Sequence, residues 1–399
     1  MLTYLTSGES HGPQLTAIID GFPAGFYVDI DEINYQLARR QKGYGRGGRM
    51  KIERDKVEVV SGLRYGYTLG SPITFVIHNK DWENWTKIMS PVGVKSNDLN
   101  LKEKSLANGI TKPRPGHADL SGAIKYNHKD IRNVLERASA RETAAKVAIG
   151  ALARQLLEHF QIRFASHVIR IGRVSLTAKY KIKDFPSFVK KVENSPVRCI
   201  RKNTEQKMIE AIKTAKKKRD SLGGIAEIIV RGLPIGLGSY AQSFRRLDGL
   251  LAGALMAIPS VKGVEIGLGF KSASLMGSQV HDEIYYKRGN DLPQKGFYRK
   301  FNNAGGIEGG ITNGEDIVIK IAAKPISTLN KPLATVDIKT KKPAKAVVER
   351  TDNCVVPALG VIGEAVAALV LADVFLEKCG SDNIAEIERN YKTFLKSPF

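Results

Sequence analysis

The sequence has little of the chemistry that would cross-link a small fold or bind a metal ion. Its 399 residues include three cysteines, Cys199, Cys354 and Cys379, which are far apart and show no CxxC spacing. An odd and scattered set excludes a disulfide framework and suits a reducing compartment. The seven histidines form no HExxH string and no His/Cys cluster. We therefore expect no protein metal site.

Segments that direct a chain to a membrane are also lacking. The first residues do not show the basic-then-apolar pattern of a signal peptide. The longest apolar run, residues 355–376, is interrupted by Glu364 and Asp373, so it reads as a buried helix rather than a membrane span. We expect a cytoplasmic protein with no membrane partner.

Acidic residues are few relative to basic ones, 40 against 62, which gives a formal net charge of +22 at pH 7. Such a charge fits a nucleic-acid partner or a small, heavily anionic ligand. Much of it lies in residues 162–220, where the basic run 216–219 reads as a solvated helix end. Aromatic content of 7% also leaves few side chains for base stacking. We therefore expect no nucleic-acid partner.

The most informative stretch begins with a stiff loop, PRPGHAD at residues 113–119. Its two prolines restrict the backbone φ angle, and its glycine allows a wide range of φ. We expect this loop to expose the side chains of Arg114 and His117.

A helix start follows this loop. Ser139 and Glu142 have the spacing of a capping box, in which each side chain satisfies a backbone N–H of the first turn. Arg137 and Arg141 flank that start. Free amides, a positive helix-dipole end and two guanidinium groups predict an anion site, although a surface helix with two solvated arginines is the alternative.

Three further loops offer ligand contacts. Residues 39–49 interleave arginines with four glycines, which suits close backbone approach and grip on phosphate or carboxylate; an RNA-binding RGG-like segment is the alternative. Residues 302–310 are too rich in glycine for regular structure, and they lack the strand and helix that flank GxGxxG in a Rossmann site. Residues 324–328 offer an ammonium group and two hydroxyl groups to a phosphate.

Hydrophobic patterning predicts many strands and few long helices. The predicted strands are residues 2–6, 14–20, 57–61, 72–78, 225–231, 264–270 and 316–322. The predicted helices are residues 31–41, 204–218 and 248–257, and one that begins near Pro357. A turn between the first two strands displays His11. Residues 81–104, which hold both tryptophans, form a long irregular excursion of the kind that serves as a lid or an oligomer contact.

Taken together, these strings resemble one family, chorismate synthase. The resemblance extends in order over nearly the whole chain and is weakest over residues 168–220 and 284–300. The matching strings are GESHG (8–12), GYGRG (43–47), PRPGHAD (113–119), RASARETA (137–144), VEIG (264–267), HDE (281–283), NAGG (303–306) and RTDNC (350–354).

The resemblance implies a fold of the α+β class, a β-α-β sandwich with a helical layer between two antiparallel sheets. It implies a single domain over residues 1–399 and a homotetramer. It also implies a lyase reaction, in which 5-enolpyruvylshikimate 3-phosphate loses phosphate by 1,4-anti elimination to give chorismate, the last step of the shikimate pathway to aromatic amino acids.

The family requires reduced FMN (FMNH2), although the reaction has no net redox change. Some members reduce their own flavin with NADPH, and those tend to carry insertions. None is obvious here, so we expect an external flavin reductase as a partner.

The resemblance also assigns roles. It makes His11 the proton donor to the departing phosphate, places His117 near flavin N1, and makes Asp352 a carboxylate that works through flavin N5. Because the substrate carries a phosphate and two carboxylates, arginines should converge on it. The expected substrate-binding residues are Arg40, Arg46, Arg49, Arg114, Arg141 and Arg350. The expected FMN contacts are Arg137, Ala138, Ser139, Pro259, Ser260, Gly309, Lys324, Pro325, Ile326, Ser327, Thr328 and Arg350.

One departure from the family pattern is SFRRLD at residues 243–248, which lacks an acid that many relatives carry before the corresponding string. Two rival functions stay open at this point. One is a flavin-dependent enzyme that acts on another anionic substrate, and the other is a basic nucleic-acid-binding protein.

Overall fold

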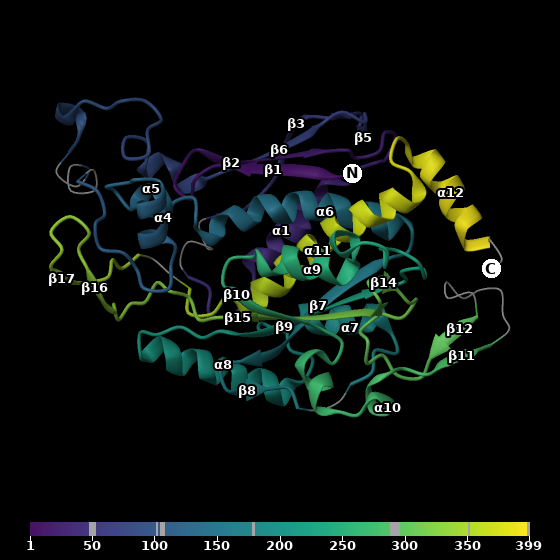
Figure 1. Cartoon of the computed structure of the whole chain (residues 1–399). Helices are drawn as coiled ribbons and strands as arrows, with labels where there is room; N and C mark the ends of the chain where they lie inside the picture. The colour runs from purple at the N-terminus through teal and green to yellow at the C-terminus, as the bar shows by residue number, and fades with distance from the viewer. Residues whose placement is uncertain are drawn as a thin grey trace.

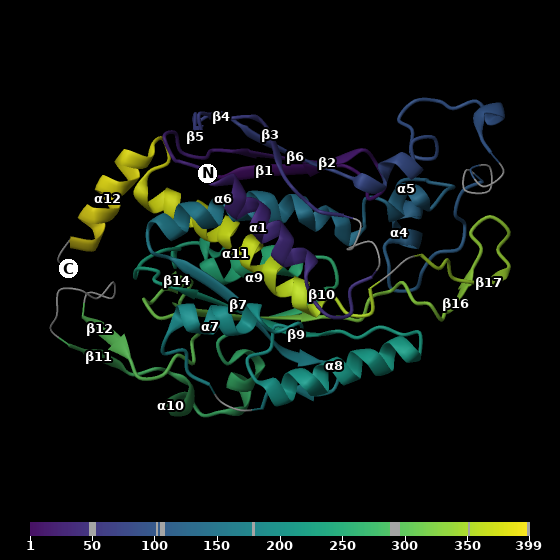
Figure 2. The ribbon, with the colours of Figure 1, turned by 180° about the vertical axis from the view of Figure 1, so that it is seen from behind.

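Two antiparallel sheets enclose a layer of helices (Figure 1, and Figure 2 from behind). The computed structural model describes residues 1–47, 53–100, 103, 108–177, 180–287, 296–349 and 352–396. Within these residues the architecture is the α+β sandwich that the sequence predicted.

The first sheet covers one side of the helices. Its strands, in spatial order, are β1 (Thr3–Ser7), β2 (Gln14–Asp20), β6 (Ile73–His78) and β3 (Glu58–Ser61). Every second side chain of β2 is buried against the helices, namely Leu15, Ala17 and Ile19. This is the pattern of a strand with one buried face, because successive side chains point to opposite faces of the sheet. The strand predicted at residues 14–20 is confirmed.

The second sheet lies on the other side of the helices. Its strands are, in spatial order, β10 (Val261–Ile266), β15 (Ile317–Ala323), β9 (Gly224–Arg231), β7 (Arg163–Ile171) and β8 (Val174–Ser175). The prediction of a strand over 264–270 is wrong at its end, because residues 269–274 form a 3₁₀ turn. Sequence patterning missed β7, which is buried on both faces over most of its length and so lacks alternation.

The helical layer consists of α1 (Ile30–Gln41), α6 (Thr143–His159), α9 (Leu247–Met256) and α11 (Val356–Cys379). Among the described residues, α11 is the helix long and apolar enough to cross a membrane, but 89% of that segment is buried inside the protein. It approaches α6 so closely that a Cβ atom on Gly150 would lie 2.5 Å from Ala365. The apolar run is therefore the central core helix, as predicted.

Helices also flank the sandwich. α7 (Phe185–Glu193) and α8 (Lys202–Lys217) pack on the outer side of the second sheet (Figures 1 and 2). α8 buries Met208 and Ile212 while the basic run 216–219 is exposed, which confirms that this run is a solvated helix end.

The remaining elements are short or lie at the two ends of the molecule. α4 (Asp119–Lys125) and α5 (Arg132–Leu135) form a lobe at one end with the excursion that follows β6, and α12 (Ile384–Lys396) lies at the other end (Figure 1). The other elements are α10 (Gly277–Val280), β4 (Leu63–Arg64), β5 (Tyr67–Thr68), β11 (Ile284–Tyr286), β12 (Phe297–Arg299), β13 (Ile307–Glu308), β14 (Ile311–Thr312), β16 (Ala334–Val336) and β17 (Pro343–Lys345).

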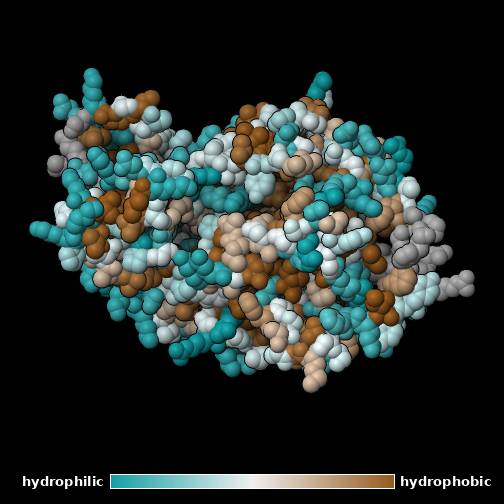
Figure 3. Space-filling view, in the orientation of Figure 1, coloured by the Kyte–Doolittle hydropathy of each residue, from teal (hydrophilic) through white to brown (hydrophobic). Residues whose placement is uncertain are grey.

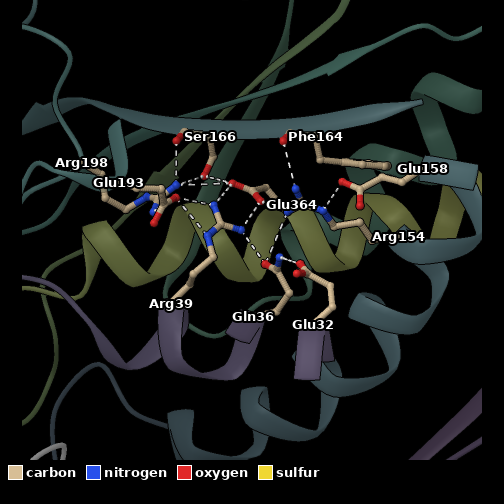
Figure 4. A network of polar contacts seen from close by, with 10 residues as sticks. All are labelled: Glu32, Gln36, Arg39, Arg154, Glu158, Phe164, Ser166, Glu193, Arg198 and Glu364. Carbon is tan, nitrogen blue, oxygen red and sulfur yellow. Dashed lines mark hydrogen bonds and ion pairs between the residues drawn. The ribbon is translucent and has the colours of Figure 1, made fainter. Parts of the chain in front are cut away.

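A buried ionic cluster sits inside the sandwich, centred on Glu364 of α11 (Figure 4). Its carboxylate accepts from Arg39 and from Arg154, each at 2.7 Å, and from Ser166 Oγ at 2.5 Å. Burial alone would raise the pKa of Glu364, but the guanidinium groups of Arg39, Arg154 and Arg198 lower it to about 2. This Glu364 cluster joins α1, α6, β7 and α11 at one point.

Candidate active site

One cavity of about 1060 Å³ brings together most of the residues that the sequence singled out. It lies where the helical layer meets the lobe of α4 and α5, and the surface is hollowed beside this lobe (Figure 3). The predicted residues on its wall are His11, His117, Asp352, Arg40, Arg46, Arg114, Arg141, Ala138, Ser139, Pro259, Ser260, Lys324, Pro325, Ile326, Ser327 and Thr328.

His11 is held on the turn between β1 and β2. Its Nδ1 atom lies 2.9 Å from Oε2 of Glu136, its ring stacks on Trp85 with centroids 4.2 Å apart, and its Nε2 atom is 4.0 Å from a carboxylate oxygen of Asp81. Burial opposes ionisation of Glu136, but the hydrogen bonds from His11 hold the pKa of that carboxyl group below its usual value. The described ring contacts are thus two carboxylates and a tryptophan, none of which the sequence indicated as partners of His11.

His117 is held in a similar way by a different carboxylate. Its Nδ1 atom lies 2.5 Å from Oδ1 of Asp119, which also accepts from Nε of Arg114 at 2.8 Å through its other oxygen. Asp119 is fully buried, which would raise its pKa, yet His117 and Arg114 hold that pKa well below the usual range. Arg114 also donates to Thr328 Oγ1 at 2.7 Å, which ties the proline-rich loop to residues 324–328.

Two of the predicted arginines share one buried acid. Arg40 Nη1 lies 3.2 Å from Asp55 Oδ2, and Arg141 Nη1 lies 2.5 Å from Asp55 Oδ1. Arg141 also donates to Asn79 Oδ1 through Nε at 2.9 Å. Its buried Nη2 has no hydrogen-bond partner within the described part of the chain, and its ion-pair partner, Glu53 Oε2, lies 3.9 Å away. A buried donor of this kind is costly to leave unpaired, which makes it a place for a ligand acceptor.

The helix start at Ser139 differs from the predicted capping box. Ser139 Oγ accepts from the N–H of Arg141 at 3.3 Å, but it caps a 3₁₀ turn, Ala140–Glu142, that precedes α6. Glu142 pairs with Lys146 at 3.1 Å instead of reaching back to Ser139. The reciprocal bond of the capping box was therefore a wrong prediction, while the helix itself is confirmed.

Asp352 lies on the opposite loop, directly before α11. Its carboxylate accepts from Arg46 at 3.0 Å and from the N–H of Gly47 at 2.5 Å. Glycine-rich residues 43–47 therefore bring their backbone up to this acid, as the composition of that loop suggested. Two strings far apart in sequence meet here.

Ser260 has an unusual backbone conformation on the cavity wall. Its φ of 73° lies in the left-handed region, which non-glycine residues rarely adopt. Its carbonyl accepts from the N–H of Lys324 at 2.9 Å, so the two loops form one continuous surface. Such strain is concentrated at functional sites.

Some predicted residues are not on this wall. Arg137 turns toward β1, where its guanidinium donates to the carbonyl oxygens of Thr6 at 2.8 Å and Gly8 at 3.2 Å. Gly309 lies in the turn between β13 and β14. Arg49 and Arg350 lie outside the described residues.

The excursion that follows β6 contributes to the cavity wall. The sequence had left open whether this segment is a lid or an oligomer contact. It supplies Trp85 and three carboxylates, those of Asp81, Glu83 and Glu103. The carboxylates Asp119 and Glu136 had a signal in the sequence, since they lie inside or next to matched strings. Trp85 lies in the excursion that the sequence singled out as a lid or an oligomer contact, whereas Asp55 had no signal.

A large cavity with two histidines, each anchored by a buried carboxylate, and several held arginines defines the site of an enzyme. Comparisons with known proteins identify which one. A family model described as chorismate synthase matches residues 2–376. The curated chorismate synthase of Bacillus pumilus is 52% identical over 391 residues, 98% of this chain and 97% of the relative. That of Alkaliphilus metalliredigens is 53% identical over 394 residues, 99% of each.

The fold comparison agrees. A solved structure, "Crystal Structure of Chorismate Synthase", is 39% identical, superposes with a TM-score of 0.76, and covers 99% of this chain and 97% of that one. The chain belongs to the chorismate synthase family.

Proposed function

We propose that this enzyme converts 5-enolpyruvylshikimate 3-phosphate into chorismate by 1,4-anti elimination of phosphate, with reduced FMN bound in the same cavity. The observation that carries the proposal is that His11, His117, Asp352 and the held arginines all face one cavity. Reduced FMN, when bound, supplies electron density to the allylic system as phosphate leaves and takes it back as the C6 hydrogen goes.

The residues present fit two anionic ligands. The cavity volume of about 1060 Å³ slightly exceeds that of single small-molecule sites, which span roughly 300–1,000 Å³. Nη2 of Arg141 makes no hydrogen bond within the described residues and lies 3.9 Å from Glu53 Oε2, so it can offer a charged donor to a phosphate or carboxylate. For the cofactor, Ser139, Ser260 and residues 324–328 offer hydroxyl groups, backbone and an ammonium group along one side of the wall.

Each catalytic side chain has a defined part in this proposal. His11 donates a proton from Nε2 to the departing phosphate, where negative charge builds up. His117 balances the negative charge of a reduced flavin, and Arg114 binds the substrate. Asp352, oriented by Arg46 and the N–H of Gly47, accepts a proton at its carboxylate.

The test is an anaerobic assay of the purified protein with 5-enolpyruvylshikimate 3-phosphate, with dithionite-reduced FMN present or omitted. We expect equal release of phosphate and chorismate, only with reduced FMN. Folded protein that releases neither would reject the reaction. Turnover of a different anionic substrate with reduced FMN would favour the rival flavin-dependent enzyme.

We further propose a single domain, a homotetramer, a cytoplasmic location and dependence on an external flavin reductase. One hydrophobic core runs from Leu2 to Tyr391, which supports a single domain. Leu5 and Ile18 are cross-strand neighbours on the outer face of the first sheet and are 76% and 39% exposed, which supports burial against another subunit. Sedimentation at micromolar concentration should give four times the chain mass. Flavin reduction by the purified protein with NADPH alone would contradict the need for a reductase.

A further inference from the structure

Glu136 is a buried acid that touches the proposed proton donor at two points. It follows the last residue of α5, and its side chain has no exposed surface. Its Oε2 accepts from the backbone N–H of His11 at 2.9 Å, and both oxygens lie within 3.0 Å of His11 Nδ1. Its Oε1 also accepts from Arg132 Nη1 at 2.9 Å.

These contacts determine which nitrogen of His11 carries hydrogen. An ionised carboxylate can only accept hydrogen bonds. The low pKa of Glu136 keeps it ionised near neutral pH. Nδ1 of His11 must therefore carry the hydrogen whether the ring is neutral or charged. Nε2 is left as the atom that faces the cavity, where Asp81 lies 4.0 Å away.

A second set of contacts holds the His11 ring from its face. Trp85 stacks on the ring with planes 26° apart, and the guanidinium carbon of Arg132 lies 5.0 Å from the Trp85 ring on which His11 stacks. Arg132 thus contacts both Glu136 and Trp85. The ring is held at an edge by Glu136 and on a face by Trp85, and this leaves little freedom for it to turn.

We propose that Glu136 is the positioning residue of His11: its carboxylate accepts from Nδ1–H and points Nε2 at the departing group of the substrate, to which Nε2 gives its hydrogen when the ring carries hydrogen on both nitrogens. The effect on turnover rests on the proposed function, whereas the effect on the imidazole does not. Glu136 does not touch the reacting atoms and acts only through His11.

Glu136→Gln tests the proposal because glutamine has the same shape but can turn its amide N–H toward Nδ1 and so favour the other tautomer. We expect kcat to fall by about 10²-fold, within the range of general acid catalysis. KM and FMN binding should change little. Glu136→Asp keeps an accepting carboxylate and should recover part of the lost kcat. Glu158→Gln is the matched control, since Glu158 also accepts from an arginine four residues earlier, Arg154, but is remote from His11. It should keep wild-type kcat.

The decisive readout is the ¹⁵N spectrum of histidine-labelled protein, with the His11 signals assigned by their loss in His11→Asn. In the wild type we expect the neutral ring of His11 to carry hydrogen on Nδ1, and in Glu136→Gln to carry it on Nε2. A wild-type ring with Nδ1 bare would overturn the proposal even if Glu136→Gln did not fold. Wild-type kcat in a folded Glu136→Gln would also overturn it. A wild type that turns over no substrate but shows the expected tautomers would reject the proposed function and keep the positioning role.

Discussion

Arg39 and Arg40 are neighbours in sequence, yet they serve two different polar sites. Arg39 enters the Glu364 cluster, where it donates to Glu364 at 2.7 Å and to Glu193 at 2.7 Å (Figure 4). Arg40 turns to the other side of α1, where it pairs with Asp55 and lines the cavity. One helix end therefore supports both a closed ionic cluster and an open site.

The two sites differ in what their charged groups face. In the Glu364 cluster the carboxylate accepts from four side chains and is enclosed by the sandwich. In the cavity, acids such as Asp55 hold the arginines in place while donors such as Arg141 Nη2 are left for a ligand. A network enclosed in the core fixes structure, whereas one that lines an open cavity can bind a ligand. Substitutions in the two regions should therefore have separable effects.

The largest effect is expected inside the closed cluster. Glu364→Ala leaves the guanidinium groups of Arg39, Arg154 and Arg198 buried without their shared acid, and should lower the free energy of unfolding by about 3–5 kcal/mol. Urea unfolding followed by circular dichroism measures this loss. Glu158→Ala, at the partly exposed edge of the cluster, should cost no more than about 0.5 kcal/mol. Equal losses in the two variants would show that the cluster does not hold the fold.

Low pH should weaken the Glu364 cluster. The pKa of Glu364 is lowered from 4.5 to about 2, so its ionised form stabilises the fold above its usual pKa, and this contribution is lost as the pH falls toward 2. A shift of that size corresponds to a stabilisation on the order of 3 kcal/mol. Stability measured between about pH 5 and pH 2 should fall less steeply in Glu364→Gln than in the wild type. Parallel pH profiles would contradict this assignment.

In the open cavity the effect should be on turnover. His11→Ala removes the proposed proton donor and should lower kcat by about 10²-fold or more. FMN binding should stay close to wild type, because His11 is not among the expected FMN contacts. Loss of flavin binding together with activity would reject this division between chemistry and binding.

The smallest effect is expected from a change of shape at constant charge. Arg141→Lys keeps a cation but loses the planar fork, including the Nη2 atom that makes no hydrogen bond within the described residues, and should raise KM for the substrate by about tenfold, with little change in kcat. Steady-state kinetics with reduced FMN at saturation measures both parameters. An unchanged KM would show that Nη2 does not meet the substrate.

The sequence predicted what rests on local pattern. Periodicity placed β2, α1 and the core helix α11 correctly, and the basic run at 216–219 was recognised as a solvated helix end. It missed β7, whose two buried faces remove the alternation that marks a strand. Resemblance to a family supplied the sandwich, because the order of the strands within a sheet depends on contacts between distant segments.

For the site, the sequence named side chains but not their partners. His11, His117 and Arg141 could be singled out from motifs. The acids that orient His11 and Arg141 are Glu136 and Asp55, and these contacts span 125 and 86 positions of the chain, which no local pattern reveals. The excess of basic residues predicted arginines in the site. It gave no indication that carboxylates of the excursion also line the cavity.

The most direct test of the central claim is a crystal structure of the protein grown with oxidised FMN and 5-enolpyruvylshikimate 3-phosphate. We predict that both ligands occupy the cavity, with an anionic group of one of them on Arg141 Nη2 and the substrate phosphate within hydrogen-bonding distance of His11 Nε2. Ligands bound elsewhere, or a substrate phosphate remote from His11, would contradict the account.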